Sequence, residues 1–463
     1  AMGGTCTKIP ETKSIIAVER NAFGRMNSGV RILDVYNFDG HRLGLGSCGH
    51  VTRATHAKTG AVRAVKTVAK AHIGNLAAFR KELEIALAMD HPNVLRIHET
   101  FEDSLGIYLV MELASGGELF DILCERGQLP ELDAAVFLKQ IMHAVGYLHA
   151  RDIVHGSIKP ENFMFNMPGN PEDATLKASC LSLVARGKGK LSIATLPPAP
   201  GAPCYRSPQA LKGSYRASDD IWSAGVTLHL MLMGYPPFLA PTTQATVKQV
   251  RAGKLDQFAS KLPANAVSLL QHMLQPNPLN RCTAAEAVSH PWFDITGRSS
   301  THRLDTNCRN NMTRFGGCTA LTKTAMQAAA RGDDHTVESC RLRRIFNFMD
   351  KDANGCITAV ELQRTLGGTL EDAREILAGL DTDKTGSLGF TEFMAGALHG
   401  EGRAKEAFSV FDRNRDGHVD LDEIRSVLSV DVTESYLARA MHDVDSNNDG
   451  VLSEAEFEMV LGM

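Results

Sequence analysis

Val154-His155-Gly156-Ser157-Ile158-Lys159-Pro160-Glu161-Asn162 is the stretch on which the interpretation of the whole chain depends. Three polar side chains stand at fixed intervals in it: the hydroxyl of Ser157, the ammonium group of Lys159 and the amide of Asn162. A serine hydroxyl is essentially un-ionised near neutral pH, so Ser157 cannot accept a proton as a carboxylate would. The stretch therefore offers groups that can hold a ligand, but no general base at position 157.

Upstream of this stretch lie the parts of a nucleotide-binding arrangement. Residues 44–51 read Gly-Leu-Gly-Ser-Cys-Gly-His-Val, the pattern G-x-G-x-x-G-x-V, whose backbone amides can fold over phosphates. About two strands later comes Ala64-Val65-Lys66, and Glu82 follows in an amphipathic segment that ends at Asp90-His91-Pro92-Asn93. A lysine that reaches phosphates and a glutamate that pairs with it are the partners such a loop needs.

Taken together, these motifs resemble those of a serine/threonine protein kinase, most closely the calcium-dependent protein kinases of plants and protists. The resemblance runs from Gly44 to Phe293 and includes Tyr108–Glu112 as a hinge, Gly116–Asp121, Asp220–Gly225, Gly234–Phe238 and Arg281. It implies a hinge that binds adenine, with Met111 as the gatekeeper. The cofactor-binding residues that it implies are Gly44, Gly46, Gly49, Val51, Ala64, Lys66, Glu82, Met111, Glu112 and Leu113.

The sequence departs from that family at the positions that carry its chemistry. In the family's H-R-D-L-K-P-E-N loop the aspartate accepts the substrate proton; here Ser157 replaces it, while Lys159 and Asn162 are retained. Cys180 stands in place of the aspartate of D-F-G, and a neutral thiol is a poor ligand for magnesium. We therefore predict that no catalytic set is intact, that ATP binding is weak or absent, and that magnesium is not held productively.

Two smaller departures concern the surroundings of the catalytic loop. Gly156 replaces the arginine that would pair with a phosphorylated activation segment. Gln209, in Ser207-Pro208-Gln209, replaces the glutamate of A-P-E, so we expect an amide contact with Arg281 instead of an ion pair.

Four tandem loops in the C-terminal part match D-x-[DN]-x-[DN/ST]-G-x₅-E, the calcium-binding loop of EF-hands. Oxygen ligands at positions 1, 3, 5 and 12, a backbone carbonyl at position 7 and a glycine at position 6 wrap Ca²⁺. We predict up to four calcium ions, paired in two lobes. The predicted ligands are Asp350, Asp352, Asn354, Cys356 and Glu361; Asp381, Asp383, Thr385, Ser387 and Glu392; Asp412, Asn414, Asp416, His418 and Glu423; and Asp445, Asn447, Asp449, Val451 and Glu456.

The charge of the ligands predicts a ranking of the four sites. We expect both C-terminal sites, 3 and 4, to carry a higher ligand charge than sites 1 and 2, with Asp420 adding a carboxylate at position 9 of site 3. In site 2, Gly389 leaves position 9 without a side chain. We expect the C-terminal pair to bind more tightly and site 2 to be the weakest.

Between the two parts lies a junction in which Arg303, Arg309, Arg314 and Lys323 alternate with the apolar residues Met312, Phe315, Leu321 and Met326. Basic residues with spaced apolar ones are typical of a calmodulin target helix, although the irregular spacing also fits a plain linker. Gly316-Gly317 predicts a break in that helix, since glycine costs about 1 kcal/mol in a helix interior. The family resemblance implies that this segment occupies the substrate cleft at rest and is taken by the calcium domain on activation.

The N-terminal residues carry a lipidation pattern. Behind Ala1, residues Met2 to Thr7 fit M-G-x-x-x-[ST], which predicts a myristoyl group on Gly3 and a palmitoyl group on Cys6; a small-residue tail is the alternative. No secretory apolar core or membrane-spanning run is visible, so we predict a cytoplasmic protein, at the cytoplasmic face of a membrane if acylated. Its ten cysteines, without CxxC pairs, are predicted to be reduced thiols.

The composition and net charge give little information about binding partners. The chain has 463 residues, 43% of them hydrophobic, and a formal charge of −4, which gives no reason to expect nucleic-acid binding. We expect a monomer whose partners are calcium, its own junction helix and a protein that the sequence does not identify.

We therefore expect an α+β bilobal protein-kinase fold followed by an all-α calmodulin-like domain with four EF-hands. The predicted parts are an N-terminal arm (1–33), a kinase-like domain (34–293, with lobes 34–113 and 114–293), the junction (294–341) and the calcium domain (342–463). The leading functional hypothesis is a calcium-binding pseudokinase that acts by binding. The alternatives are a weakly active calcium-dependent kinase, and a calcium buffer with an inert kinase-like body.

Overall fold

The computed structural model describes residues 25–46, 49–170, 173–179, 184–185, 191–192, 203–253, 262–298, 304, 306–318, 320–331, 336–398, 404–427, 441–442 and 444–460. Its architecture confirms the predicted α+β bilobal body followed by an all-α domain with calcium loops. Cys180 and the predicted acylation sites Gly3 and Cys6 lie outside the described residues.

The N-terminal lobe is built on a six-stranded sheet of order β1-β5-β6-β4-β3-β2 in the described residues. Neighbouring strands are antiparallel except β1 and β5. Helix α2 is capped by Asn75, the residue before it, whose side chain accepts a hydrogen bond from the Ala78 amide and so satisfies one of the free amides of the first turn. The bounds are β1 (Arg25–Ser28), β2 (Tyr36–Gly46), β3 (Gly49–His56), β4 (Val62–Ala69), α2 (Leu76–Leu87), β5 (Ile97–Glu102) and β6 (Gly106–Met111).

Helix α4 forms the centre of the C-terminal lobe. Its buried residues lie on every side of the helix, as expected of a helix that other elements enclose. The largest fully buried side chains around it include Tyr147, Trp222 and Trp292. The helices are α3 (Leu119–Arg126), α4 (Glu131–Ala150), α5 (Ala217–Met233), α6 (Thr243–Ala252), α7 (Ala264–Met273) and α8 (Ala284–Val288). The strand pairs are β7 (Ile153–Val154) with β10 (Val184–Ala185), β8 (Phe163–Phe165) with β9 (Leu176–Ala178), and β11 (Leu191–Ser192) with β12 (Ser214–Tyr215).

The junction and the calcium loops share a second hydrophobic core. The junction forms two helices, α9 and α10, with the break at Gly316-Gly317 that the sequence predicts. The bounds are α9 (Thr306–Gly316), α10 (Ala320–Ala330), α11 (Val337–Met349), α12 (Ala359–Leu366), α13 (Leu370–Leu380), α14 (Phe390–Leu398), α15 (Ala404–Phe411), α16 (Leu421–Val427) and α18 (Glu454–Val460).

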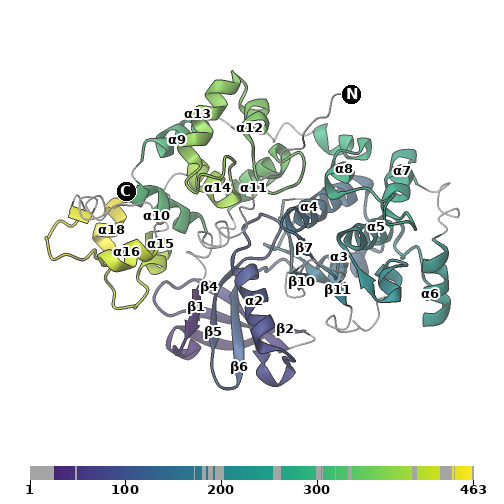
Figure 1. Ribbon diagram of the computed structural model, residues 1–463, viewed down its shortest axis with the longest axis horizontal. Coiled ribbons are helices and arrows are strands. Elements are labelled where there is room, and N and C mark those ends of the chain that lie inside the picture. Colours follow the sequence, from purple (N-terminus) through teal and green to yellow (C-terminus); the bar gives the residue numbers. More distant parts are fainter. Residues whose placement is uncertain are drawn as a thin grey trace, which may run out of the picture.

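The calcium domain lies against both lobes of the kinase-like body (Figure 1). Loop 3 reaches the N-terminal lobe, where Arg415 pairs with Glu99 of β5 at 3.1 Å. Loop 1 reaches the C-terminal lobe, where Arg151, the residue that follows α4, donates a hydrogen bond to the carbonyl of Asn354 at 3.0 Å.

Between these two contacts lies a buried polar cluster that joins the parts of the chain. The carboxylate of Asp90 accepts hydrogen bonds from Arg96 at 2.8 Å and from both the amide and the hydroxyl of Thr391 at 2.8 and 2.6 Å. Arg96 also donates to the carbonyl of Arg331, just after α10, at 2.8 Å. Burial alone would raise the pKa of Asp90, but the charges of Arg96 and Arg331 and the bonds from Thr391 lower it. The segment between α2 and β5, the end of the junction and loop 2 are thus joined through Asp90 and Arg96.

Candidate functional site

The loop that carries Ser157 is held by Asp220 at the start of α5. This buried carboxylate accepts hydrogen bonds from the backbone amides of His155 and Gly156, both at 2.9 Å, and from the Tyr215 hydroxyl at 3.0 Å. Gly156 has a φ of +77°, a left-handed backbone that glycine adopts without a steric cost. The sequence indicates only that an arginine is lost at this position; the structure adds that glycine suits the backbone that Asp220 fixes.

Within that loop, the retained polar side chains bind one another. The Asn162 amide donates to the carbonyl of Ser157 at 2.6 Å and to its hydroxyl at 2.8 Å, and the Ser157 amide donates to His155 at 3.3 Å. The ammonium group of Lys159 lies 3.5 Å from the Glu161 carboxylate. The structure therefore brings Ser157, Lys159 and Asn162 together, with a hydroxyl at the position of the family's catalytic carboxylate.

The hinge residue Glu112 directs its carboxylate into a buried ion pair. Glu112 and Lys177, each 4% exposed, lie 2.8 Å apart, and the Arg96 amide donates to the same carboxylate at 2.8 Å. Burial lowers the pKa of Lys177 in spite of this partner. The side chain of Glu112 is thus committed to the scaffold, which leaves the hinge backbone as the group that could bind adenine.

Other predicted cofactor residues lie on neighbouring strands of the N-terminal lobe. Ala64 and Met111 pair across β4 and β6, next to the buried Lys66, and Val51 pairs with Lys66 across β3 and β4. Burial raises the pKa of Glu82 on α2. The pairing of Lys66 with Glu82 stays a prediction.

The glycine-rich segment is partly explained by the packing of the sheet. A Cβ atom on Gly49 would lie 1.7 Å from the carbonyl oxygen of Thr67, so only glycine fits where β3 approaches β4. A Cβ atom on Gly44 would meet nothing within 4 Å. The third glycine therefore has a structural role as well as the phosphate-binding role predicted for it. The tip of the segment, Ser47 and Cys48, lies outside the described residues.

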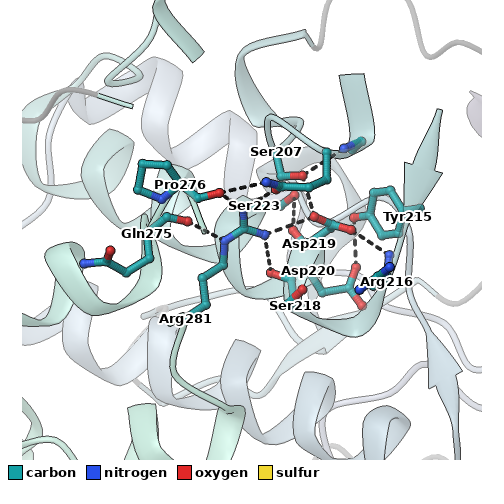
Figure 2. Close-up of polar contacts among 12 residues, drawn as sticks. Ser207, Tyr215, Arg216, Ser218, Asp219, Asp220, Ser223, Gln275, Pro276 and Arg281 are labelled. Atoms are coloured by element: carbon teal, nitrogen blue, oxygen red, sulfur yellow. Dashed lines mark hydrogen bonds and ion pairs between the residues drawn. The ribbon is translucent and has the colours of Figure 1, made fainter. Parts of the chain in front are cut away.

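Arg281 makes the contact with Gln209 that the sequence predicts, and it also keeps an acidic partner. Figure 2 shows its guanidinium bound to Asp219, at 3.0 Å, and to the carbonyls of Ser218 and Gln275. The third guanidinium nitrogen, Nη2, donates to the side-chain oxygen of Gln209. Asp219 therefore neutralises the buried arginine, so the change to glutamine leaves no uncompensated charge.

The calcium loops share one backbone conformation. Position 4 has a left-handed φ between +55° and +64° in Ala353, Lys384, Arg415 and Asn448, and the glycine at position 6 has a φ between +77° and +94°. The position-12 glutamates accept backbone hydrogen bonds from their own loops, as Glu361 does from Lys351 and Thr358 at 2.9 Å. Antiparallel bridges join Ile357 to Leu388 and Val419 to Leu452, which confirms the predicted pairing in two lobes.

These residues fit a calcium ion. The ligand oxygens of Asp350, Asp352 and Glu361 lie within 4.8 Å of one another, and so do those of Asp381, Asp383 and Glu392. In loop 4, the buried Oδ1 of Asp445 has no hydrogen-bond partner among the described residues, as expected of an atom that a cation would contact. When bound, Ca²⁺ supplies a positive charge that draws such oxygens together.

The position-12 glutamates differ in their ionisation. Burial and the nearby charge of Asp383 raise the pKa of Glu392 in site 2 to about 7. Hydrogen bonds from Ser453 lower the pKa of Glu456 in site 4 to about 2. Because calcium binds the carboxylate form, it must displace a proton from part of the Glu392 population near neutral pH. This difference supports the prediction that site 2 is the weakest.

The ranking of the other sites needs a correction. Site 4 holds three carboxylates, Asp445, Asp449 and Glu456, as sites 1 and 2 do, so the charge argument for a tighter C-terminal pair applies to site 3 alone. Moreover, Lys58 from the turn between β3 and β4 lies 3.3 Å from Asp412, the first ligand of site 3, and donates to the Arg415 carbonyl at 2.6 Å. Sequence reasoning missed this cation because 354 residues separate the pair.

We expect Lys58→Met to raise the calcium affinity of site 3 about 1.4- to fivefold, because the half-exposed ammonium group opposes calcium binding by roughly 0.2 to 1 kcal/mol. Calorimetric titration of the full chain, with and without Glu423→Gln to identify site 3, measures this. Lys405→Met is the matched control, since Lys405 pairs with Glu454, which is not a predicted ligand. Unchanged or weaker binding at site 3 would show that Lys58 does not compete.

The junction helices are bound by the calcium domain. Cys308, Met312 and Phe315 of α9 and Leu321 and Met326 of α10 are buried in its core. Polar contacts add to this packing: Lys323 donates to the carbonyl of Gly379 at 2.8 Å, and Gln327 to the hydroxyl of Thr382 at 2.6 Å. A Cβ atom on Gly379 would lie 2.9 Å from the Cα atom of Gly316, so the glycine that ends α9 also permits a close helix approach.

The described residues include seven cysteines, and none of these forms a disulfide, as predicted. They are Cys124, Cys204, Cys282, Cys308, Cys318, Cys340 and Cys356. In the part of the chain that the structure describes, no helix has the length and apolar character needed to span a bilayer.

Comparison with known proteins gives matches over most of the chain. Residues 38–293 match the protein kinase domain, and residues 353–399 and 401–461 each match an EF-hand domain pair. The chain is similar to calcium-dependent protein kinase 3 of Plasmodium berghei (strain Anka), with 33% identity over 92% of this chain and 79% of the relative. It is also similar to calcium-dependent protein kinase 14 of Arabidopsis thaliana, with 32% identity over 95% of this chain and 88% of the relative.

Proposed function

Because the chain belongs to the calcium-dependent protein kinase family, we propose that it is a pseudokinase of that family, which binds calcium and acts by binding a protein partner rather than by phosphotransfer. Its EF-hand domains bind calcium, as the family assignment and the loop geometry support. The kinase-like body would serve as a docking platform whose surface the calcium domain covers or exposes.

The observation that carries this proposal is the catalytic loop. Ser157 has its hydroxyl within 2.8 Å of the Asn162 amide and offers no carboxylate to accept a proton. Nevertheless, the loop backbone is held by Asp220, and the buried pair of Glu112 and Lys177 fixes the hinge. The kinase-like scaffold is thus kept although the catalytic base is missing. This combination favours a protein that acts by binding rather than by phosphotransfer.

A calcium buffer with an inert body is less well supported. Three of the calcium loops contact the kinase-like body directly. Asn354 of loop 1 contacts Arg151, Thr391 of loop 2 contacts Asp90, and Asp412 of loop 3 contacts Lys58. Such contacts make the position of the body depend on the calcium loops, which a buffer would not need. Small-angle scattering with calcium and with chelator separates the two, since a buffer would change only within its EF-hand lobes.

For the nucleotide, we expect weak or absent ATP binding that magnesium does not strengthen. The glycine-rich segment, Lys66 and the hinge are present, whereas Cys180 cannot hold the metal under the phosphates. Thermal unfolding with ATP, with and without magnesium, measures this, because a ligand that binds only the folded state raises its apparent stability. Calcium added to the same samples is the positive control, and strong magnesium-dependent stabilisation by ATP would contradict the expectation.

A further inference from the structure

The first calcium loop is shaped to fit helix α4 of the kinase-like body. Ala353, at position 4 of the loop, is fully buried and belongs to the hydrophobic core of that body rather than to that of the calcium domain. A Cβ atom on Gly146 of α4 would lie 2.4 Å from the Ala353 carbonyl oxygen. A Cβ atom on Gly355 would lie 2.2 Å from the ring of Tyr147. Each surface therefore has a glycine where the other presses against it.

Arg151, at the end of α4, holds the backbone of this loop at its sharpest turn. Its guanidinium stacks on the Tyr147 ring, 3.8 Å from the ring centre, which fixes its orientation. From there it donates to the Asn354 carbonyl at 3.0 Å and lies 3.7 Å from the Cys356 sulfur. Asn354 and Cys356 are the ligand positions on either side of Gly355, and the carbonyl of position 7 is itself a ligand in such loops. Arg151 thus restrains two of the ligand positions of site 1.

A second side chain from α4 faces the first ligand. His143 is fully buried, and neither of its ring nitrogens has a hydrogen-bond partner among the described residues. Its Nδ1 lies 3.7 Å from Oδ2 of Asp350, which is also fully buried. The carboxylate of Asp350 accepts amide hydrogen bonds from Asn354 and Gly355, so His143 borders the same network that orients the ligand.

These contacts differ in kind from those of loop 3. There, Lys58 places a cation on Asp412 itself and so competes with calcium. At loop 1, the guanidinium contacts a backbone carbonyl and a sulfur atom rather than the ligand carboxylates. The contacts of α4 are therefore of the type that orients ligands from outside a metal site, where the loss of a partner commonly lowers metal affinity 10- to 100-fold.

We propose that helix α4 of the kinase-like body is the outer shell of calcium site 1, so that His143 and Arg151 are positioning residues and site 1 reaches its full affinity only when the two domains are docked. This inference rests on the calcium binding in the proposed function but not on the absence of phosphotransfer, so the two can fail separately. By linkage, the coupling is reciprocal: calcium in site 1 strengthens the docking on α4 by the same factor.

The test is a double-mutant cycle on the full chain, read by calorimetric calcium titration. Arg151→Met keeps much of the aliphatic packing but removes the donors, and Glu361→Gln disables site 1. We expect Arg151→Met to weaken one binding event roughly tenfold, and to have no further effect in the Glu361→Gln background. His143→Gln should weaken the same event. Arg251→Met, an exposed arginine on α6, is the control for the loss of a positive charge and should leave the titration unchanged.

Two results would overturn the proposal. One is a titration of Arg151→Met that matches the unmutated chain, which would show that the contact does not orient site 1. The other is an equal loss of affinity with and without Glu361→Gln, which would show a general effect on the fold. Thermal unfolding in chelator, where site 1 is empty, identifies a variant that has lost its fold. In that case the milder Arg151→Lys replaces Arg151→Met in the cycle, because lysine keeps the charge but cannot reproduce the paired donors of the guanidinium.

Discussion

Asp90→Ala is expected to detach the calcium domain from the kinase-like body and to lower the stability of the docked chain by about 3 to 5 kcal/mol, the usual cost of removing one partner of a buried ion pair. The substitution leaves the guanidinium of Arg96 and both donors of Thr391 buried without their acceptor. In saturating calcium, the melting midpoint should fall by roughly 6 °C or more. The radius of gyration from small-angle scattering should rise.

The control for this variant is Asp422→Ala on α16. Asp422 is 86% exposed and pairs with Arg425 at 2.9 Å, so its loss should change stability by less than about 0.5 kcal/mol. If Asp90→Ala kept both the melting midpoint and the radius of the unmutated chain, the cluster at Asp90 would not be what joins the domains.

Ser157→Asp is expected to leave the chain without phosphotransfer, whereas Ser157→Asp combined with Cys180→Asp is the smallest change that can restore it. A missing general base costs about 10² to 10⁴ in rate, and a missing electrostatic stabiliser about 10² to 10³. Restoring the base alone leaves the metal without its carboxylate, because Cys180 supplies a thiol. The measurement is radiolabelled phosphate transfer to a generic peptide at high enzyme concentration.

The matched control for these variants is Ser157→Asn, which has nearly the same shape as aspartate but cannot act as a base. It should remain inactive with or without Cys180→Asp. Transfer by Ser157→Asp alone at ordinary kinase rates would mean that Cys180 does not prevent the placement of magnesium.

The features that the sequence predicts correctly are those that local residues encode. The calcium loops follow from ligands and a glycine within twelve positions, and the break between α9 and α10 follows from Gly316-Gly317. The bilobal body follows from motifs whose order and spacing identify the family. In each case the physical cause lies within a few residues of its effect.

The docking of the two domains could not be predicted in this way. Asp90 is visible in the sequence only as part of a helix end, and its partner Thr391 is 301 residues away. The fit of Gly146 against Ala353 depends on two surfaces that meet only in the folded chain. Likewise, the sequence does not show that the side chain of Glu112 pairs with Lys177, which lies 65 positions further along the chain.

Whether this chain is a pseudokinase is tested most directly by measuring phosphotransfer by the unmutated chain in saturating calcium, with magnesium, radiolabelled ATP and a peptide substrate. The same mixture in chelator is the comparison. We predict no transfer above the enzyme-free background in either condition, since the hydroxyl of Ser157 cannot act as the base. Calcium-dependent transfer at roughly 1 per second or faster, the range of ordinary kinases, would contradict it.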